Sequence, residues 1–157
     1  MKAKHHFWSS IAVGGALYWA TGSSAALAGS MVGGFLIDSD HVIDQIWSIR
    51  HGAPLKKQLD TGQDSRSSAT RLSFFRPRKL VRLPLVFHSY ELLALLSVLT
   101  LILRTPFLIG LWSGYVLHIS LDVARHHHEF RSRLFYLLSY RLVRRFRRDQ
   151  LIKSDYL

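Results

Sequence analysis

Three segments of this chain are apolar and almost free of charge, and they constrain its fold more than any other feature. Residues 11–37 carry no charged side chain, and residues 85–103 and 106–123 are nearly as apolar. A helix needs about 20 such residues to cross a hydrocarbon core of ~30 Å, and a backbone in lipid must satisfy its own hydrogen bonds. The sequence therefore predicts an all-α fold and, more specifically, a polytopic membrane protein.

The connections between these segments differ in how clearly they can be read. Only Arg104 and Thr105 separate the second and third segments before Pro106, which predicts a tight turn and an antiparallel helical hairpin. The N-terminal segment 7–37 allows three interpretations: one long span, two short helices broken at 20–25 (ATGSSA), or a signal peptide. Lys2 and Lys4 before the apolar run, and ALA at 26–28, are features of a signal peptide.

The distribution of basic residues decides among these interpretations. The chain has 21 Lys and Arg against 10 Asp and Glu, a net charge of +11, and most of the basic residues fall within 50–82 or 125–153. Basic blocks beside apolar spans follow the positive-inside rule, so we expect a bilayer with anionic lipids as the partner and no nucleic acid. If the N-terminus, the 45–84 segment and the C-terminal region are all cytoplasmic, residues 7–37 must cross twice.

This topology predicts a four-helix transmembrane bundle in the inner (cytoplasmic) membrane, multi-pass, with both termini cytoplasmic. Residues 1–124 would form the membrane domain, with 45–84 as a cytoplasmic loop, and residues 125–157 a basic tail. The polar stretch 50–80 is interpreted as a solvated linker or a lid. The oligomeric state is not indicated.

The ionisable side chains inside the apolar segments gather at one level of this predicted bundle. His88 and Glu91 are three residues apart, and His118 and Asp122 are four apart, so each pair shares a helix face. The topology places a larger set on the cytoplasmic side: His5, His6, Asp38, Asp40, His41, Asp44, His88, Glu91, His118 and Asp122. A single histidine in a membrane helix is more often an interhelical hydrogen-bonding group, but their shared depth favours one metal site.

Helix bundles build metal sites from imidazole and carboxylate groups on facing helices, often with two ions bridged by acids. The chain has no cysteine, so nitrogen and oxygen ligands are expected, and a divalent metal such as zinc, manganese, iron or magnesium fits them. The number of ligands is sufficient for two ions. His5 and His6 are equal candidates.

Three motifs in this order resemble the membrane-bound metal-dependent hydrolases, small inner-membrane proteins that include a LexA-regulated type in enteric bacteria. They are GFLIDSDHVID at 34–44, FHSYELL at 87–93 and LHISLDV at 117–123. The family has a histidine near the start of helix 1, Pro-Asp-x-Asp-His closing helix 2, His-Ser opening helix 3 and His-x-x-x-Asp closing helix 4. The matching positions are His6 (or His5), Asp38, Asp40, His41, His88, Ser89, His118 and Asp122. The resemblance covers about residues 5–123.

The chain departs from the family pattern at two places. Ile37 stands where the family has proline, and Leu83 and Pro84 stand where many members have an additional His-Arg. Glu91 is a candidate replacement ligand. From the shared depth of these side chains and the resemblance to the family, the expected metal ligands are His6, Asp38, Asp40, His41, His88, His118 and Asp122.

Together these features predict a metal-dependent hydrolase at the cytoplasmic membrane face, with Asp44 or Glu91 as general base. The surrounding arginines favour a phosphoester or lipid-phosphate substrate. The alternative is a non-catalytic metal-binding scaffold, sensor or carrier. The far halves of the spans at 85–103 and 106–123 carry almost no polar residues, which disfavours a transport path.

The tail is predicted to lie beside the site rather than to form part of it. Apolar residues at helical spacing between 132 and 153, with arginines at the other positions, predict one basic amphipathic helix on an anionic leaflet. Its removal is expected to leave metal binding intact. The histidines at 126–128 either extend the site or form a surface run, and the second interpretation is preferred.

Overall fold

The computed structural model describes residues 3–41 and 85–153, and every regular element in these two ranges is a helix, which confirms the all-α prediction. The long helices are α1 (Ala3–Thr21), α2 (Ser24–Gly34), α5 (Tyr90–Leu103) and α6 (Pro106–His126). Short ones are the 3-10 turns η1 (Leu36–Asp38) and η2 (Arg133–Tyr136), with α7 (Leu138–Val143) and α8 (Arg148–Leu151). The predicted 45–84 loop lies outside the described residues.

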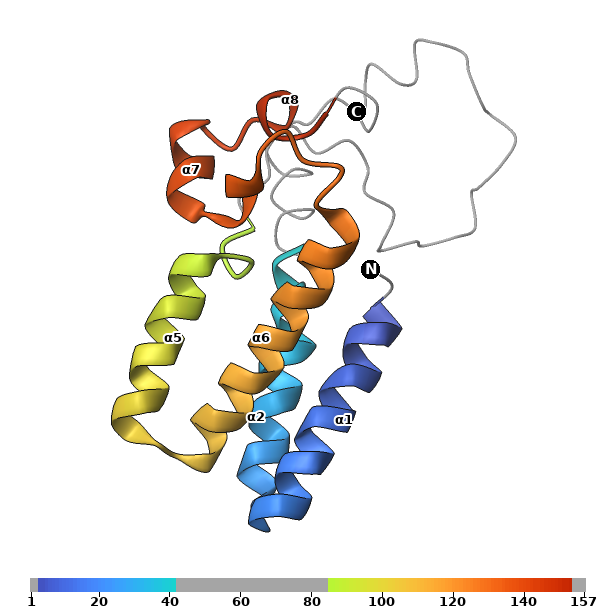
Figure 1. Ribbon diagram of the computed structural model, residues 1–157, viewed down its shortest axis with the longest axis vertical. Coiled ribbons are helices and arrows are strands. Elements are labelled where there is room, and N and C mark those ends of the chain that lie inside the picture. Colours follow the sequence, from blue (N-terminus) through green and yellow to red (C-terminus); the bar gives the residue numbers. More distant parts are fainter. Residues whose placement is uncertain (1–2, 42–84, 154–157) are drawn as a thin grey trace, which may run out of the picture.

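The four long helices form two hairpins whose connections lie at the same end of the bundle, while the start of α1 and the C-terminal segment lie at the other end (Figure 1). The N-terminal hairpin confirms the two-helix interpretation of residues 7–37. Helix α1 is followed by Gly22, whose φ of +67° is a left-handed conformation that favours glycine. The second hairpin turns at Arg104, and Thr105 caps α6 by accepting a hydrogen bond from the Leu108 amide at 3.3 Å.

Helices α2 and α6 approach each other through two pairs of glycines spaced four apart. Gly29 and Gly33 on α2 face the backbone of α6, and Gly110 and Gly114 on α6 face the backbone of α2. A Cβ atom at any of the four would collide with a carbonyl of the other helix. This close approach is the packing that small residues permit between membrane helices.

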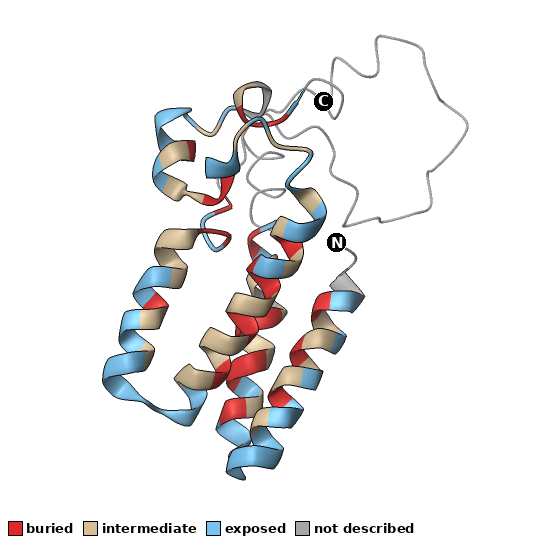
Figure 2. Cartoon of the chain, viewed as in Figure 1, coloured by how far each residue is buried: buried red, intermediate tan, exposed pale blue. Residues whose placement is uncertain are grey.

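The remaining helices join this pair through side chains. Ser30 on α2 donates to the Ser10 carbonyl of α1 at 2.9 Å, and the Trp112 indole of α6 donates to the Ser97 hydroxyl of α5 at 2.8 Å. Among the described helices, only α6 is long and apolar enough to cross a membrane by those criteria, and α5, with 14 residues, is shorter. Helix α5 is exposed along much of its length (Figure 2), and its exposed large apolar residues are Leu95, Val98, Leu99, Leu101, Ile102 and Leu103.

The C-terminal segment is not the single amphipathic helix that the sequence predicts. The short helix α7 ends at Val143, and Arg145 and Phe146 follow it with φ angles of 52° and 57°, which no α-helix can contain. The chain then folds back, and a β-bridge joins Phe130 to Ile152. Leu142 of the predicted membrane-facing stripe is exposed.

The segment instead packs onto the bundle and supplies half of the hydrophobic core. That core contains, from the bundle, Leu85, Leu96, Tyr115 and Ile119 and, from the C-terminal segment, Phe135, Tyr136, Leu151 and Ile152. Below it, α2 and α6 are held by the glycine contacts described above. The core therefore lies at the end of the molecule where the polar residues meet.

A pair of glycine substitutions tests the α2–α6 contact. Gly114→Ala places a methyl group against the Ser30 carbonyl, so we expect a loss of about 1–3 kcal/mol in the free energy of unfolding. Gly15→Ala is the matched control, since no atom lies within 4 Å of its added Cβ, and alanine gains up to about 1 kcal/mol in a helix. Thermal unfolding of both variants gives the comparison. Equal melting temperatures would contradict the close helix contact.

Candidate metal centre

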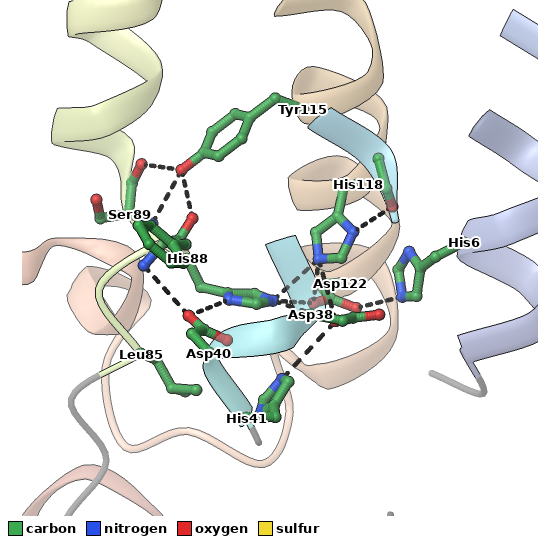
Figure 3. Close-up of polar contacts among 12 residues, drawn as sticks. His6, Asp38, Asp40, His41, Leu85, His88, Ser89, Tyr115, His118 and Asp122 are labelled. Carbon is green, nitrogen blue, oxygen red and sulfur yellow. Dashed lines mark hydrogen bonds and ion pairs between the residues drawn. The ribbon is translucent and has the colours of Figure 1, made fainter. Parts of the chain in front are cut away.

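Five ionisable side chains from four separate segments meet at the end of the bundle covered by the C-terminal segment (Figure 3). His6 comes from α1, Asp38 from η1, and His88 from the turn before α5, while His118 and Asp122 come from successive turns of α6. The three histidines and Asp122 are buried, and Asp38 is partly buried. The fold therefore gathers residues that are more than a hundred positions apart in the sequence.

At the centre of this group, two imidazole nitrogens face each other: Nε2 of His88 lies 2.9 Å from Nε2 of His118. Oδ2 of Asp122 lies 3.5 Å from both nitrogens, and Oδ1 of Asp38 lies 3.5 Å from that of His88 and 3.6 Å from that of His118. Ligands bound at ~2.1 Å to one ion are ~3.0–3.4 Å apart in octahedral or tetrahedral geometry. The spacing is therefore close to that of atoms sharing one ion.

His6 and His41 extend this group on opposite sides. Nε2 of His6 lies 3.2 Å from Oδ1 of Asp122, and Nε2 of His41 lies 3.9 Å from Oδ1 of Asp38. Three overlapping sets have ligand atoms within 4.8 Å of one another: His6, Asp38 and His118; Asp38, His41 and His88; His88, His118 and Asp122. Because Asp38 belongs to two sets, this arrangement can hold one ion or a bridged pair.

Hydrogen bonds on the other ring nitrogens fix which atoms point into the centre. Nδ1 of His118 lies 2.8 Å from the Gly34 carbonyl, which can only accept, so Nδ1 carries the proton. Nδ1 of His88 lies 2.9 Å from Oδ2 of Asp40 in the same way. With both protons held outside, both Nε2 lone pairs point inward, and two facing lone pairs need a cation or a proton between them.

The carboxylates around the two imidazoles favour a cation or a proton between the two Nε2 atoms. Nδ1 of His88 faces Asp40 and its Nε2 faces Asp38 and Asp122, so three carboxylates surround this imidazole. Burial raises the pKa of Asp38, and this is outweighed by the hydrogen bond from His88 and the charges of His118 and His6, so the pKa is lowered. A divalent ion bound between the two nitrogens would compete with a proton there.

The other predicted site residues have different places. Asp40, expected as a ligand, accepts hydrogen bonds through Oδ2 from His88 Nδ1 and from the Phe87 amide at 3.2 Å, so it orients His88. His5 is exposed whereas His6 is buried in the cluster, which decides between the two. His41 is the most exposed member, with 47% of its side chain accessible. Asp44 lies outside the described residues.

Glu91, expected as a general base or replacement ligand, is directed toward the C-terminal segment. Its carboxylate accepts hydrogen bonds from the Leu138 and Ser139 amides at 2.8 and 2.9 Å and from the Ser139 hydroxyl at 2.8 Å. These amides belong to the first turn of α7, where a carboxylate satisfies donors that have no partner in the helix. His126 pairs with Glu129 at 2.7 Å, and neither belongs to the three ligand sets found among the described residues.

Two residues that support His88 were not recognised from the sequence. Tyr115 places its hydroxyl 2.7 Å from the Phe87 carbonyl and 2.8 Å from that of Ser89. Arg141 was assigned to the lipid-facing arginines, but it is fully buried. Its guanidinium donates to the carbonyls of Leu85 and His88, each at 2.9 Å. No spacing rule distinguishes this arginine from its exposed neighbours.

Comparisons of the chain with protein families, with curated proteins and with solved structures found no match. The resemblance to membrane-bound metal-dependent hydrolases therefore rests on the order and spacing of the residues quoted from the sequence. The geometry of the cluster stands independently of that resemblance.

Arg141 provides a test of how the C-terminal segment acts on the centre. Arg141→Met removes the two guanidinium hydrogen bonds to the Leu85 and His88 carbonyls, so we expect the turn carrying His88 to shift and metal affinity to fall by about tenfold or more, with helix content retained. Arg144→Met, at an exposed position, is the matched control. Titration of metal into the purified variants measures the effect. Wild-type affinity in Arg141→Met would contradict this role, and would agree with the prediction that the tail is dispensable for metal binding.

Proposed function

We propose that this chain is an integral-membrane, metal-dependent hydrolase whose site lies at the cytoplasmic membrane face. The observation that carries the proposal is the pair of inward-facing Nε2 atoms of His88 and His118, flanked by the carboxylates of Asp38 and Asp122. Buried imidazole and carboxylate groups with fixed tautomers are typical of metal ligation. Three buried histidines favour zinc, manganese or iron over magnesium.

The residues of the chain divide the work of such a site among them. His6, Asp38, His88, His118 and Asp122 would hold the metal, and Asp40 and the Gly34 carbonyl orient the two central imidazoles. A divalent ion bound there lowers the pKa of its water toward ~7 and supplies hydroxide at neutral pH. His41, at the accessible side next to Asp38, is placed to accept a proton or contact substrate.

The membrane assignment is supported by the distribution of exposed apolar side chains. The outer face of α5 is apolar over most of its length, and Trp19 near the end of α1 is 90% exposed. An apolar surface of this kind favours contact with lipid or another apolar partner. In contrast, the buried charged side chains belong to the opposite end of the bundle, where the termini of the hairpins lie (Figure 1).

One observation favours the alternative of a non-catalytic metal-binding scaffold, sensor or carrier. Glu91 caps α7 and is used there, so it is not placed to act as general base. The catalytic proposal then depends on His41 or on residues outside the described part of the chain, such as Asp44. The experiment that tests the function must therefore measure metal binding and turnover separately.

Metal content and phosphoester hydrolysis of the detergent-purified protein test the function. We expect chelator-sensitive turnover of a phosphomonoester or phosphodiester substrate, lost by at least about a hundredfold in His118→Ala and in His6→Ala. His5→Ala is the matched control, because it removes the adjacent, exposed histidine. Bound metal without turnover of any phosphoester would favour the non-catalytic alternative. Equal effects of His5→Ala and His6→Ala would contradict the assigned ligand.

Single-cysteine labelling tests the orientation, since the chain has no cysteine of its own. Ser24→Cys introduces an exposed thiol at the α1–α2 connection, and Arg144→Cys introduces one in the C-terminal segment. The positive-inside rule predicts that an impermeant reagent labels position 24 in intact cells and position 144 only after permeabilisation. The reverse pattern would place the metal centre on the outer face.

A further inference from the structure

A cavity of about 660 Å³ lies between the end of α6, the start of α5 and the C-terminal segment. This volume is within the range of ligand sites, about 300–1,000 Å³. Val123, which lines it, directly follows Asp122 of the metal centre. The cavity is therefore at the same end of the bundle as the cluster, but its lining residues are different.

Half of the lining residues are basic. They are His127, His128, Arg131, Arg133 and Lys153, and none of the lining residues in the described part of the chain is an aspartate or glutamate. Arg131 is held in place because its Nε donates to the Ile152 carbonyl at 2.8 Å. Glu129 lies beside this lining, where it pairs with His126 at 2.7 Å and is 3.9 Å from His128. The cavity thus carries a net positive charge that suits an anion.

The rest of the lining suits an apolar group. Tyr90, Phe130 and Tyr136 contribute aromatic rings, and the rings of Tyr90 and Tyr136 are 5.7 Å apart between centroids. Tyr136 is buried, and burial together with the negative charge of Asp122 raises the pKa of its hydroxyl.

We propose that this cavity binds the phosphate of an amphiphilic phosphate ester, with the basic side chains on the phosphate and the aromatic rings on the adjoining apolar group. The proposal rests on the proposed function in one respect, because it makes this ligand the substrate of the neighbouring metal centre. Binding itself needs no metal. Charge-assisted hydrogen bonds from arginine are well suited to phosphate oxygens.

Calorimetric titration of the purified chain in a nonionic detergent, with chelator present, tests the cavity. The probes are hexyl phosphate, inorganic phosphate and hexanol. We expect hexyl phosphate to bind most tightly, because it alone uses both halves of the lining. The double substitution Arg133→Gln with Lys153→Gln should weaken its binding by at least about tenfold, or ~1.4 kcal/mol.

The double substitution Arg125→Gln with Arg144→Gln is the control, since it removes the same charge at exposed positions outside the lining. It should change affinity less than about twofold. Equal weakening by both pairs would show non-specific attraction and overturn the proposal, as would hexanol binding as tightly as hexyl phosphate.

A competition arm identifies the source of the phosphate ester. Phosphatidylcholine nanodiscs that contain phosphatidic acid, compared with nanodiscs lacking it, displace hexyl phosphate if the natural ligand is a lipid. If neither kind of nanodisc displaces hexyl phosphate, and hexyl phosphate still binds, the natural ligand is a soluble ester. If the chain binds hexyl phosphate but turns over no phosphoester, the hydrolase proposal is wrong and the proposed binding cavity stands.

Discussion

The contact between the His88 and His118 imidazoles is the constraint on which the rest of this end of the molecule depends. Their Nε2 atoms are 2.9 Å apart while both Nδ1 protons are held by acceptors outside the pair. Such a pair is unfavourable unless a proton or a cation lies between the nitrogens. Asp38 and Asp122 provide the negative charge that stabilises that cation, and burial strengthens the interaction by excluding water.

The surrounding structure serves to hold these two rings in place. The glycine contact between α2 and α6 brings the Gly34 carbonyl at the end of α2 within reach of His118 on α6. His88 lies in a turn rather than in a helix, so its backbone needs other partners, which Tyr115 and Arg141 supply. The C-terminal segment is fixed in turn by Glu91 at the start of α7. A tail that looks like a membrane anchor in sequence thus becomes part of the support for the centre.

The sequence predicted those features that depend on local backbone rules or on the position of charge. Gly22 and the Arg104–Thr105–Pro106 turn mark helix ends, and the arginine and lysine distribution indicated that residues 7–37 form two helices. It did not distinguish features that depend on tertiary contacts. His5 and His6 differ by about 100° around one helix, and only packing shows which of them is buried. Likewise, only the folded chain shows that Asp40 hydrogen-bonds His88 and that Arg141 is buried against the Leu85 carbonyl.

The most direct test of the central claim is X-ray absorption at the metal edge of the purified wild-type protein, combined with its metal content. The account predicts at least one tightly bound divalent ion per chain, with at least two imidazole nitrogens and carboxylate oxygens at ~2.0–2.2 Å, and no such signal in His88→Ala or His118→Ala. A wild-type protein that takes up no divalent metal, or one whose bound metal keeps the same imidazole ligands in both variants, would contradict it.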